Sequence, residues 1–165
     1  TNRLGFSGEN YVIVTHTNIT ESKKKEEALQ FSENQWESLV TAMPDFISIL
    51  DRNGKFEYLN HFADGYSNND IRDKYIYDFV PADSVPVLQN AIQDVLSTKK
   101  TRFVENNGFG DFGSLRYYDN YLVPVLHDNS VQRIIMISRD ITESRYAKAK
   151  IEENEKLLQL AFQAT

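Results

Sequence analysis

Short apolar segments separated by polar turns occupy the centre of the chain and predict a β-sheet. Residues 45–50 form the first strand, the turn 51–54 reverses the chain, and residues 55–59 return as its hairpin partner. In this second segment Phe56 and Tyr58 alternate with charged neighbours, as expected for a strand with two unlike faces. Three further apolar segments predict strands over residues 101–105, 115–126 and 131–138.

The segment between these two groups of strands has the pattern of helices. Asn60 can cap a short helix that ends near Tyr66, and the polar cluster 67–70 can cap another. Residues 85–96 carry apolar side chains at the spacing of an amphipathic helix. This order of elements predicts an α+β fold, in which a five-stranded antiparallel sheet has its helices grouped on one side.

The two flanks of this central unit predict long helices. Thr20 is a suitable N-cap residue, and nothing after it interrupts a helix before Pro44. Positions 25, 29, 32, 36, 39 and 43, and likewise 147, 151, 154, 158, 161 and 165, alternate by four and three residues and are largely apolar, which predicts short coiled-coil seams. The seam residues are Leu29, Trp36, Leu39 and Met43 in the first helix and Ile151, Asn154 and Leu158 in the second. Asn154 is a polar seam residue of the kind that fixes register; packing of each helix on its own sheet is the alternative.

One phrase occurs twice. Ile-Thr-Glu-Ser stands at residues 19–22 and again at 141–144, an offset of 141 − 19 = 122 residues. The apolar residues 12–14 before the first phrase match residues 134–136 before the second. A period of this length indicates tandem domains, because solenoid units repeat at roughly 20–50 residues.

The repeat predicts four segments, and each has its own expected role. These are the C-terminal strand remnant of a preceding unit (1–18), a helical linker (19–43), a complete domain (44–142) and an exit helix that leads to a following unit (143–165). Within the first of them, residues 7–10 form a turn and residues 11–17 a strand.

Composition narrows the possible functions. Hydrophobic residues make up 41% of the chain, enough for a buried core, and the net charge is −6. The basic clusters 23–25 and 99–100 do not form a continuous face, so nucleic-acid binding is not expected. The chain has no cysteine, which excludes disulfides and thiolate metal sites and suits a reducing, cytoplasmic compartment. No apolar run reaches the roughly 20 residues of a membrane span, although the parent protein could still be membrane-attached.

Two candidate chemical sites are better explained as structure. The run from Gly108 to Gly113 has the G-x-G-x-x-G spacing, but residues 115–118 continue as a strand where a phosphate-binding loop needs a helix. A hairpin loop is therefore expected. His16, His61 and His127 are isolated from other potential ligands, so a metal site is not expected. No catalytic triad or acid–base pair is evident, and we expect the fragment not to be an enzyme.

Several motifs occur together in one order. They are the strand-turn-strand 46–55, Tyr58-Leu59-Asn60 leading to Gly65-Tyr66-Ser67, Phe79-Val80-Pro81-Ala82-Asp83 before the long helix, Val123-Pro124-Val125, and Arg139-Asp140-Ile141-Thr142-Glu143 at the end. On these motifs residues 34–144 resemble a PAS domain, the sensory module found in series in histidine kinases. Asp73 departs from this pattern because it stands where the family usually has glycine, and the 79–83 segment is one residue short.

The resemblance implies a PAS fold flanked by long N- and C-terminal linker helices, with an interior pocket that can hold a small ligand. By analogy the pocket would be lined by Ile47, Ile49, Phe79, Leu88, Ile92, Tyr121, Val123 and Ile135. The ligand and cofactor stay unknown. Haem-binding relatives carry an axial histidine on the long helix, which has none here, and a covalent flavin needs cysteine. Haem, covalent flavin and metal are therefore not expected.

The resemblance also implies how a signal would leave the domain. Asp140, Ile141, Thr142 and Glu143 form the family's exit motif. We expect the Thr142 hydroxyl to cap the exit helix, and Asp140 to accept backbone hydrogen bonds or to pair with Arg139 or Arg145.

The expected function is a non-catalytic sensor or relay module of a multidomain signalling protein, in the first place a two-component histidine kinase. Its expected partners are a second copy through the linker helices, neighbouring PAS units and an output domain in the parent chain. A ligand-free dimerisation scaffold is one alternative. A parent protein with another output, such as a cyclic-nucleotide synthase, is a second.

Overall fold

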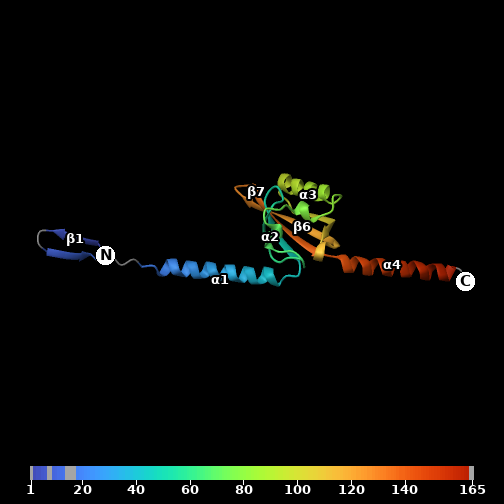
Figure 1. The fold of residues 1–165 in the computed structure, drawn as a ribbon, viewed down its shortest axis with the longest axis horizontal. Helices are drawn as coiled ribbons and strands as arrows, with labels where there is room; N and C mark the ends of the chain where they lie inside the picture. The colour runs from blue at the N-terminus through green and yellow to red at the C-terminus, as the bar shows by residue number, and fades with distance from the viewer. Residues whose placement is uncertain (1, 7–8, 14–17, 164–165) are drawn as a thin grey trace. The chain divides into compact units, whose positions relative to one another are not determined.

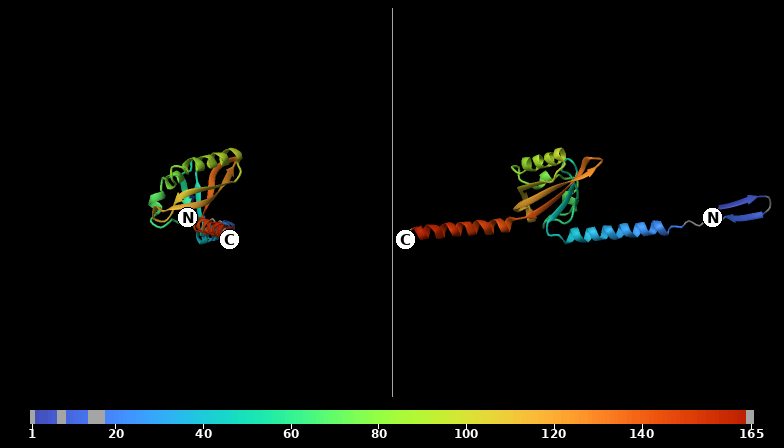
Figure 2. Two further views of the ribbon diagram at one scale, coloured as in Figure 1. Left: turned by 90° about the vertical axis from the view of Figure 1, so that its right-hand side faces the viewer. Right: turned by 180° about the vertical axis from the view of Figure 1, so that it is seen from behind.

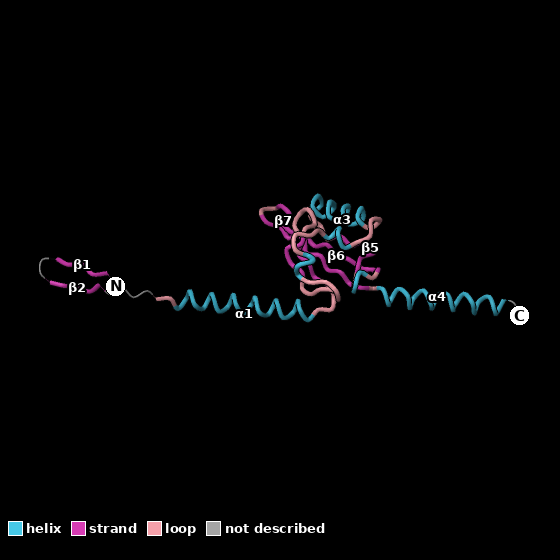
Figure 3. The backbone as a smooth tube through the Cα atoms, viewed as in Figure 1, coloured by secondary structure: helices cyan, strands magenta, loops and turns pink. Residues whose placement is uncertain are grey.

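The computed structural model describes residues 2–6, 9–13 and 18–163, and the chain divides into two units, Thr1–Leu39 and Val40–Thr165. In the first unit β1 (Asn2–Phe6) and β2 (Glu9–Ile13) pair antiparallel and lie side by side in Figure 3. The predicted strand is present at residues 11–13, but Glu9 and Asn10, which were expected in the turn, already belong to β2. Residues 7–8 and 14–17, and with them His16, lie outside the described residues. Helix α1 (Thr20–Ala42) begins at the threonine that the sequence indicates.

The second unit is built on a sheet of five antiparallel strands. They are β3 (Phe46–Leu50), β4 (Phe56–Leu59), β5 (Arg102–Phe109), β6 (Leu115–His127) and β7 (Ser130–Asp140), in the order β4-β3-β7-β6-β5. The order places the first and last strands of the unit, β3 and β7, side by side at the centre of the sheet (Figure 1). The expected fold class is confirmed.

Helices and 3₁₀ turns lie between β4 and β5, within the β5–β6 loop and after β7. They are α2 (Asn68–Ile71), the 3₁₀ turn η1 (Ile76–Phe79), α3 (Val85–Thr98), a second 3₁₀ turn η2 (Asp111–Gly113) within the β5–β6 loop, and α4 (Thr142–Gln163) after β7. Helix α3 lies over one face of the sheet, which we call the inner face (Figure 2). Its buried residues Leu88, Ala91, Ile92 and Val95 pack with Leu50, Leu122, Ile134 and Met136 of the strands.

The short helix expected between Asn60 and Tyr66 is absent, so that prediction is wrong. Asn60 instead ties backbone segments together. Its Oδ1 accepts a hydrogen bond from Ile47 N at 2.8 Å, and its Nδ2 donates to the carbonyls of Val40 and Asp45 at 3.0 and 3.1 Å. Because these bonds fix where the chain leaves β4, they hold the following segment against the inner face without a helix.

Asp73 adopts a backbone conformation that favours glycine. Its φ is +62°, in the left-handed region that aspartate tolerates better than most non-glycine residues. Its carboxylate accepts a hydrogen bond from Lys55 Nζ at 2.7 Å, which joins this turn to the start of β4. The aspartate that departs from the family pattern therefore fits the turn and adds a contact to Lys55.

Candidate functional site

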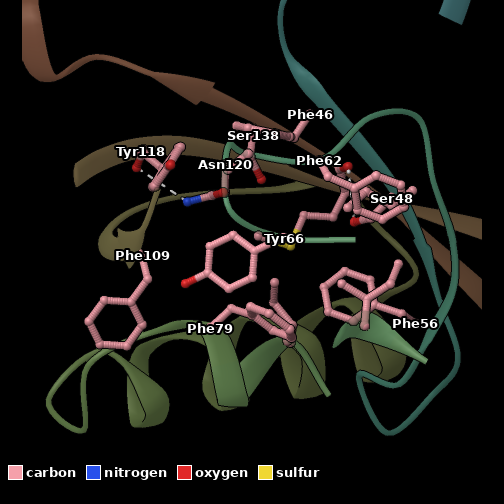
Figure 4. Close-up of a pocket in the computed structure, with 15 residues that line it drawn as sticks. Phe46, Ser48, Phe56, Phe62, Tyr66, Phe79, Phe109, Tyr118, Asn120 and Ser138 are labelled. Carbon is pink, nitrogen blue, oxygen red and sulfur yellow. Dashed lines mark hydrogen bonds between the residues drawn. The ribbon is translucent and has the colours of Figure 1, made fainter. Parts of the chain in front are cut away.

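A cavity of about 100 Å³ lies between the inner face of the sheet and the segment that joins β4 to α3 (Figure 4). It is lined by Phe46, Ser48, Phe56, Leu59, Phe62, Ala63, Tyr66, Ile71, Ile76, Phe79, Phe109, Tyr118, Asn120, Met136 and Ser138. None of these residues carries a formal charge at neutral pH, and seven of the fifteen are aromatic. The site can therefore hold a small molecule by apolar contact with a few polar groups.

The strand register explains which side chains form the floor of this cavity. Alternate residues of a strand face opposite sides of the sheet. Asn120 of β6 pairs with Ser138 of β7, and Ser138 pairs in turn with Phe46 of β3, so the three form one row across the inner face. Ser48 lies in the adjacent row, opposite Met136. Two serines and an asparagine thus form a polar strip in an otherwise apolar site.

The roof of the cavity is a cluster of aromatic rings. The Phe79 ring packs edge-to-face against Phe56, with centroids 5.6 Å apart, and against Tyr66 at 5.8 Å. At the edge of the floor, the Phe46 ring of β3 stacks on the His61 ring, with centroids 4.5 Å apart. Burial lowers the pKa of His61, so this histidine is neutral at pH 7. Rings in these arrangements are held by packing and by their quadrupoles.

The polar groups of the floor are deeply buried. Asn120 is 1% exposed, and its Nδ2 donates to Asn106 Oδ1 at 2.7 Å, to Tyr118 O at 3.2 Å and to Val104 O at 3.3 Å. Burial raises the pKa of Tyr118 to about 12, and the nearby Asp140 carboxylate adds to this rise. The phenol therefore stays neutral at physiological pH.

The lining of this cavity differs from the one expected by analogy. Of the expected residues, Phe79 lines it. Leu88 and Ile92 lie on the buried side of α3, in the neighbouring part of the core. The other five, Ile47, Ile49, Tyr121, Val123 and Ile135, lie on the outer face of the sheet, because they alternate with the inward-facing residues. A shift of one residue along a strand exchanges the two faces.

The exit motif is anchored to β6 by two hydrogen bonds, and a third closes its own turn. Thr142 Oγ1 accepts from Tyr117 N at 2.9 Å, and Ile141 N donates to Tyr117 O at 2.9 Å. Asp140 Oδ1 accepts from Thr142 N at 2.8 Å. Asp140 thus accepts a backbone hydrogen bond, which is one of the two expected alternatives, and it caps the first turn of α4. The Thr142 hydroxyl was expected to cap the helix, and this prediction is wrong, because the hydroxyl fastens the helix to the sheet instead.

Charged side chains reinforce the same joint. Arg145 on the first turns of α4 lies 3.3 Å from Glu105 of β5, and its guanidinium sits 4.5 Å above the Tyr117 ring. Arg139 pairs with Asp45 at 2.9 Å, so the basic group nearest to Asp140 is Arg116, at 3.9 Å. Glu143 is exposed in the first turn, where its charge favours the helix N-terminus.

The repeated phrase produces the same local structure in both copies. Asn18 Oδ1 accepts from Thr20 N at 3.0 Å, as Asp140 does from Thr142 N. The Lys23 amide donates to Ile19 O at 2.9 Å, and the Arg145 amide donates to Ile141 O at 2.8 Å. Both helices therefore begin with an equivalent capped turn.

The seam residues are exposed on the two long helices of the single chain. Leu29, Trp36, Leu39, Met43, Ile151 and Leu158 have exposed fractions between 46% and 64%. Asn154 is exposed as well. Apolar side chains in such numbers on helices are typical of surfaces that pack against another element.

The remaining chemical candidates show no assembled site. The glycine-rich run forms the β5–β6 loop, with β6 following it, as expected for a hairpin. His127 lies at the surface, 3.6 Å from Asp128. Across the described part of the chain, no three histidine or acidic side chains converge on a common point that a metal ion could occupy. The helices described here are also too short or too polar to cross a membrane.

Comparisons with known proteins agree with this architecture. A family profile described as "PAS fold" matches residues 40–146, well over half of the chain. The PAS domain of an HTR-like protein from Haloarcula marismortui has a TM-score of 0.60 and 23% identity over 72% of this chain and 99% of its own. A sensory box histidine kinase/response regulator from Burkholderia thailandensis has a TM-score of 0.54 and 17% identity, over 74% and 93%.

A third solved structure contains a ligand. The PAS domain of the RpfR quorum-sensing receptor from Cronobacter turicensis, in complex with BDSF, has a TM-score of 0.51 and 16% identity, over 61% of this chain and 96% of its own. A comparison with curated protein sequences gave no match. The profile match, the strand order and the exit motif lead to one conclusion: this chain belongs to the PAS family, whose domains are sensory, non-catalytic modules.

Proposed function

We propose that this chain is a sensor and relay module of a multidomain signalling protein, in the first place a two-component histidine kinase, and that its cavity binds a small molecule. One observation carries this proposal. Tyr118 and Asn120 of β6 line the cavity, while Tyr117 of the same strand segment holds Ile141 and Thr142 of the exit motif. A ligand that displaces β6 would therefore displace the start of α4 with it.

Two similar structures support this proposal. One comes from a protein described as a sensory box histidine kinase/response regulator, and another holds a ligand, BDSF, in a PAS domain. A ligand-free scaffold and a different output, such as cyclic-nucleotide synthesis, are the competing functions. We place the module in the cytoplasm because its cysteine-free sequence suits a reducing compartment.

Xenon provides a test that does not depend on knowing the ligand, because this atom enters dry apolar cavities. Amide shifts of the ¹⁵N-labelled chain under xenon pressure are expected at the cavity residues and also at Ile141 and Thr142. Ala63→Phe, which fills the cavity, should abolish both sets of shifts, and Ala63→Leu should reduce them. Ala149→Phe makes the same change on the exposed surface of α4 and should have no effect.

The result that contradicts the proposal is equally specific. Xenon shifts confined to the cavity, with unchanged amides at Ile141 and Thr142, would show that the cavity is not coupled to the exit helix. Shifts that persist in Ala63→Phe would show that xenon enters elsewhere. Circular dichroism of the variants confirms that the fold is retained, since overpacking can cost about 1–3 kcal/mol.

We further propose that the module acts as a homodimer through its linker helices, next to other PAS units and an output domain of the parent chain. The exposed seam residues support this proposal, and Asn154 would fix the register. Leu39, 64% exposed, is the seam residue best suited to a test. In sedimentation equilibrium, Leu39→Lys should weaken association at least tenfold, whereas Asn34→Lys, on the opposite, exposed face of α1, should change it less. Equal association constants for the two variants would show that the seam residues do not form the dimer interface.

A further inference from the structure

We infer that the cavity takes a neutral molecule with a single aromatic ring and one hydroxyl or amino group, of which phenol is the simplest example. This inference rests on the proposed sensory function, because it names the class of ligand that the same cavity would bind. Four properties of the cavity define the class: its size, its aromatic lining, its lack of charge and two polar side chains that face it.

Size limits the ligand to about one ring. The cavity holds about 100 Å³ of free space. An apolar protein cavity of about 150 Å³ accommodates benzene, so this one suits a single ring with at most a small substituent after minor side-chain adjustment. Long acyl chains and fused cofactors such as flavin exceed this volume.

The aromatic lining favours a flat ring over an aliphatic body of equal size. Phe79 packs edge-to-face on Phe56 and Tyr66, and all three rings border the same space (Figure 4). Rings prefer to meet other rings edge to face or offset, with centroids about 4.5–7 Å apart. A ligand ring placed among them continues a geometry that the protein already uses.

The residues that line the cavity also exclude a charged ligand. None of the fifteen lining residues can pair with an ion, and the nearest histidine, His61, is covered by the Phe46 ring. A carboxylate or ammonium group would lose its hydration without gaining a partner of opposite charge. The ligand is therefore neutral.

The floor supplies a specific polar anchor. The Asn120 amide nitrogen makes three hydrogen bonds, but no described residue donates to its Oδ1, although the side chain is 1% exposed and lines the cavity. Ser138, its partner in the β6–β7 register, lines the same space, and its hydroxyl makes no hydrogen bond with the described residues. Figure 4 shows the two side chains next to each other.

This pair matches one hydroxyl or amino group. A ligand O–H or N–H can donate to Asn120 Oδ1, and its oxygen or nitrogen can accept from Ser138 Oγ. Because Asn120 Oδ1 receives no hydrogen bond from the described residues, a ligand that supplies a donor gains a bond that an apolar ring of the same size cannot make. The inward-facing pair thus selects for one polar substituent on the ring.

Calorimetric titration of the whole chain with phenol, toluene and benzoate tests the inference. We expect phenol to bind at least tenfold more tightly than toluene, and benzoate to bind at least a hundredfold more weakly than phenol. Ser138→Ala should weaken phenol binding about three- to tenfold and leave toluene binding unchanged. Ser97→Ala, the same change on the exposed surface of α3, should affect neither. Asn120→Leu, if folded, should reverse the preference of phenol over toluene.

Each contrary result is decisive for this inference and separable from the proposed function. Equal affinity for phenol and toluene would show that Asn120 and Ser138 do not bind the polar substituent. Tight binding of benzoate would show that the ligand need not be neutral. No binding of any of the three probes overturns the inference altogether. The sensory proposal is decided separately, by whether xenon in the cavity shifts the exit-motif amides.

Discussion

Ile134→Ala is expected to lower the free energy of unfolding by about 3–5 kcal/mol, whereas Ile135→Ala should lower it by about 1–2 kcal/mol. The two residues are adjacent in β7 and chemically identical, but Ile134 is fully buried beneath α3 and Ile135 is half-buried on the outer face. Removing the Ile134 side chain leaves a cavity in the close-packed core. Removing Ile135 exposes a surface that already meets solvent.

Urea unfolding followed by circular dichroism measures both values under the same conditions. Because the two variants lose the same atoms, their difference reports the environment of each side chain and not its size. Equal costs, or a larger cost for Ile135→Ala, would mean that β7 presents the opposite face to α3. The register of the whole sheet would then have to be reassigned, since β7 lies at its centre.

The same pair shows why the fold was predictable and the cavity was not. Alternation and turn residues locate the strands, and the ordered motifs identify their arrangement. Which alternate residues of a strand face the core is harder to assign when both faces of the strand are apolar. Residues 134–137 read Ile-Ile-Met-Ile, so their pattern does not say which residues face inward. The analogy selected Ile135 and Val123, one position away from the inward-facing Met136 and Leu122.

The polar residues of these strands could have indicated which side chains face inward. Asn120 and Ser138 are register partners on neighbouring strands, and Ser48 lies in the adjacent row, opposite Met136. Polar residues in an apolar strand are commonly assigned to the solvent side, and here that rule fails because the three residues line a cavity. Only cross-strand register, which a single sequence does not supply, brings them together.

The roof of the cavity was beyond sequence pattern for a different reason. Phe62, Ala63 and Tyr66 belong to a segment whose short helix was expected from Asn60 as a cap. A capping residue in a sequence is equally able to bond distant backbone groups, and Asn60 does so with Val40 and Asp45. Tertiary hydrogen bonds thus overrode a local preference, and the residues they hold could not be assigned to the cavity beforehand.

The exit motif shows a third relation between sequence and structure, because its residues were identified but the role expected of the Thr142 hydroxyl was wrong. Asp140 rather than Thr142 caps α4, and the freed hydroxyl bonds the neighbouring strand. Both residues accept hydrogen bonds from backbone amides, so composition cannot distinguish the roles. The arrangement makes Thr142 the link between the cavity strand and the exit helix.

Thr142→Val is therefore expected to weaken that link with little change in shape. The substitution keeps the branched side chain and removes the hydroxyl, so the Tyr117 amide loses its acceptor, at a cost of about 1–3 kcal/mol in unfolding free energy. Thr142→Ser keeps the hydroxyl and should stay within about 1 kcal/mol of the parent chain. Urea unfolding of the two variants measures this difference.

The more informative effect of Thr142→Val is on coupling. Xenon should still shift the amides of the cavity residues in this variant, while the shifts at Ile141 and Arg145 should fall to less than half of their value in the parent chain. Thr142→Ser should retain them. In the full-length protein the same pair of variants should separate ligand binding, which both keep, from a change in output, which only Thr142→Ser keeps. If Thr142→Val stays folded and transmits normally, the hydroxyl serves the stability of the joint alone, and the path from β6 to α4 must run through the Ile141 backbone or the Arg145–Glu105 pair instead.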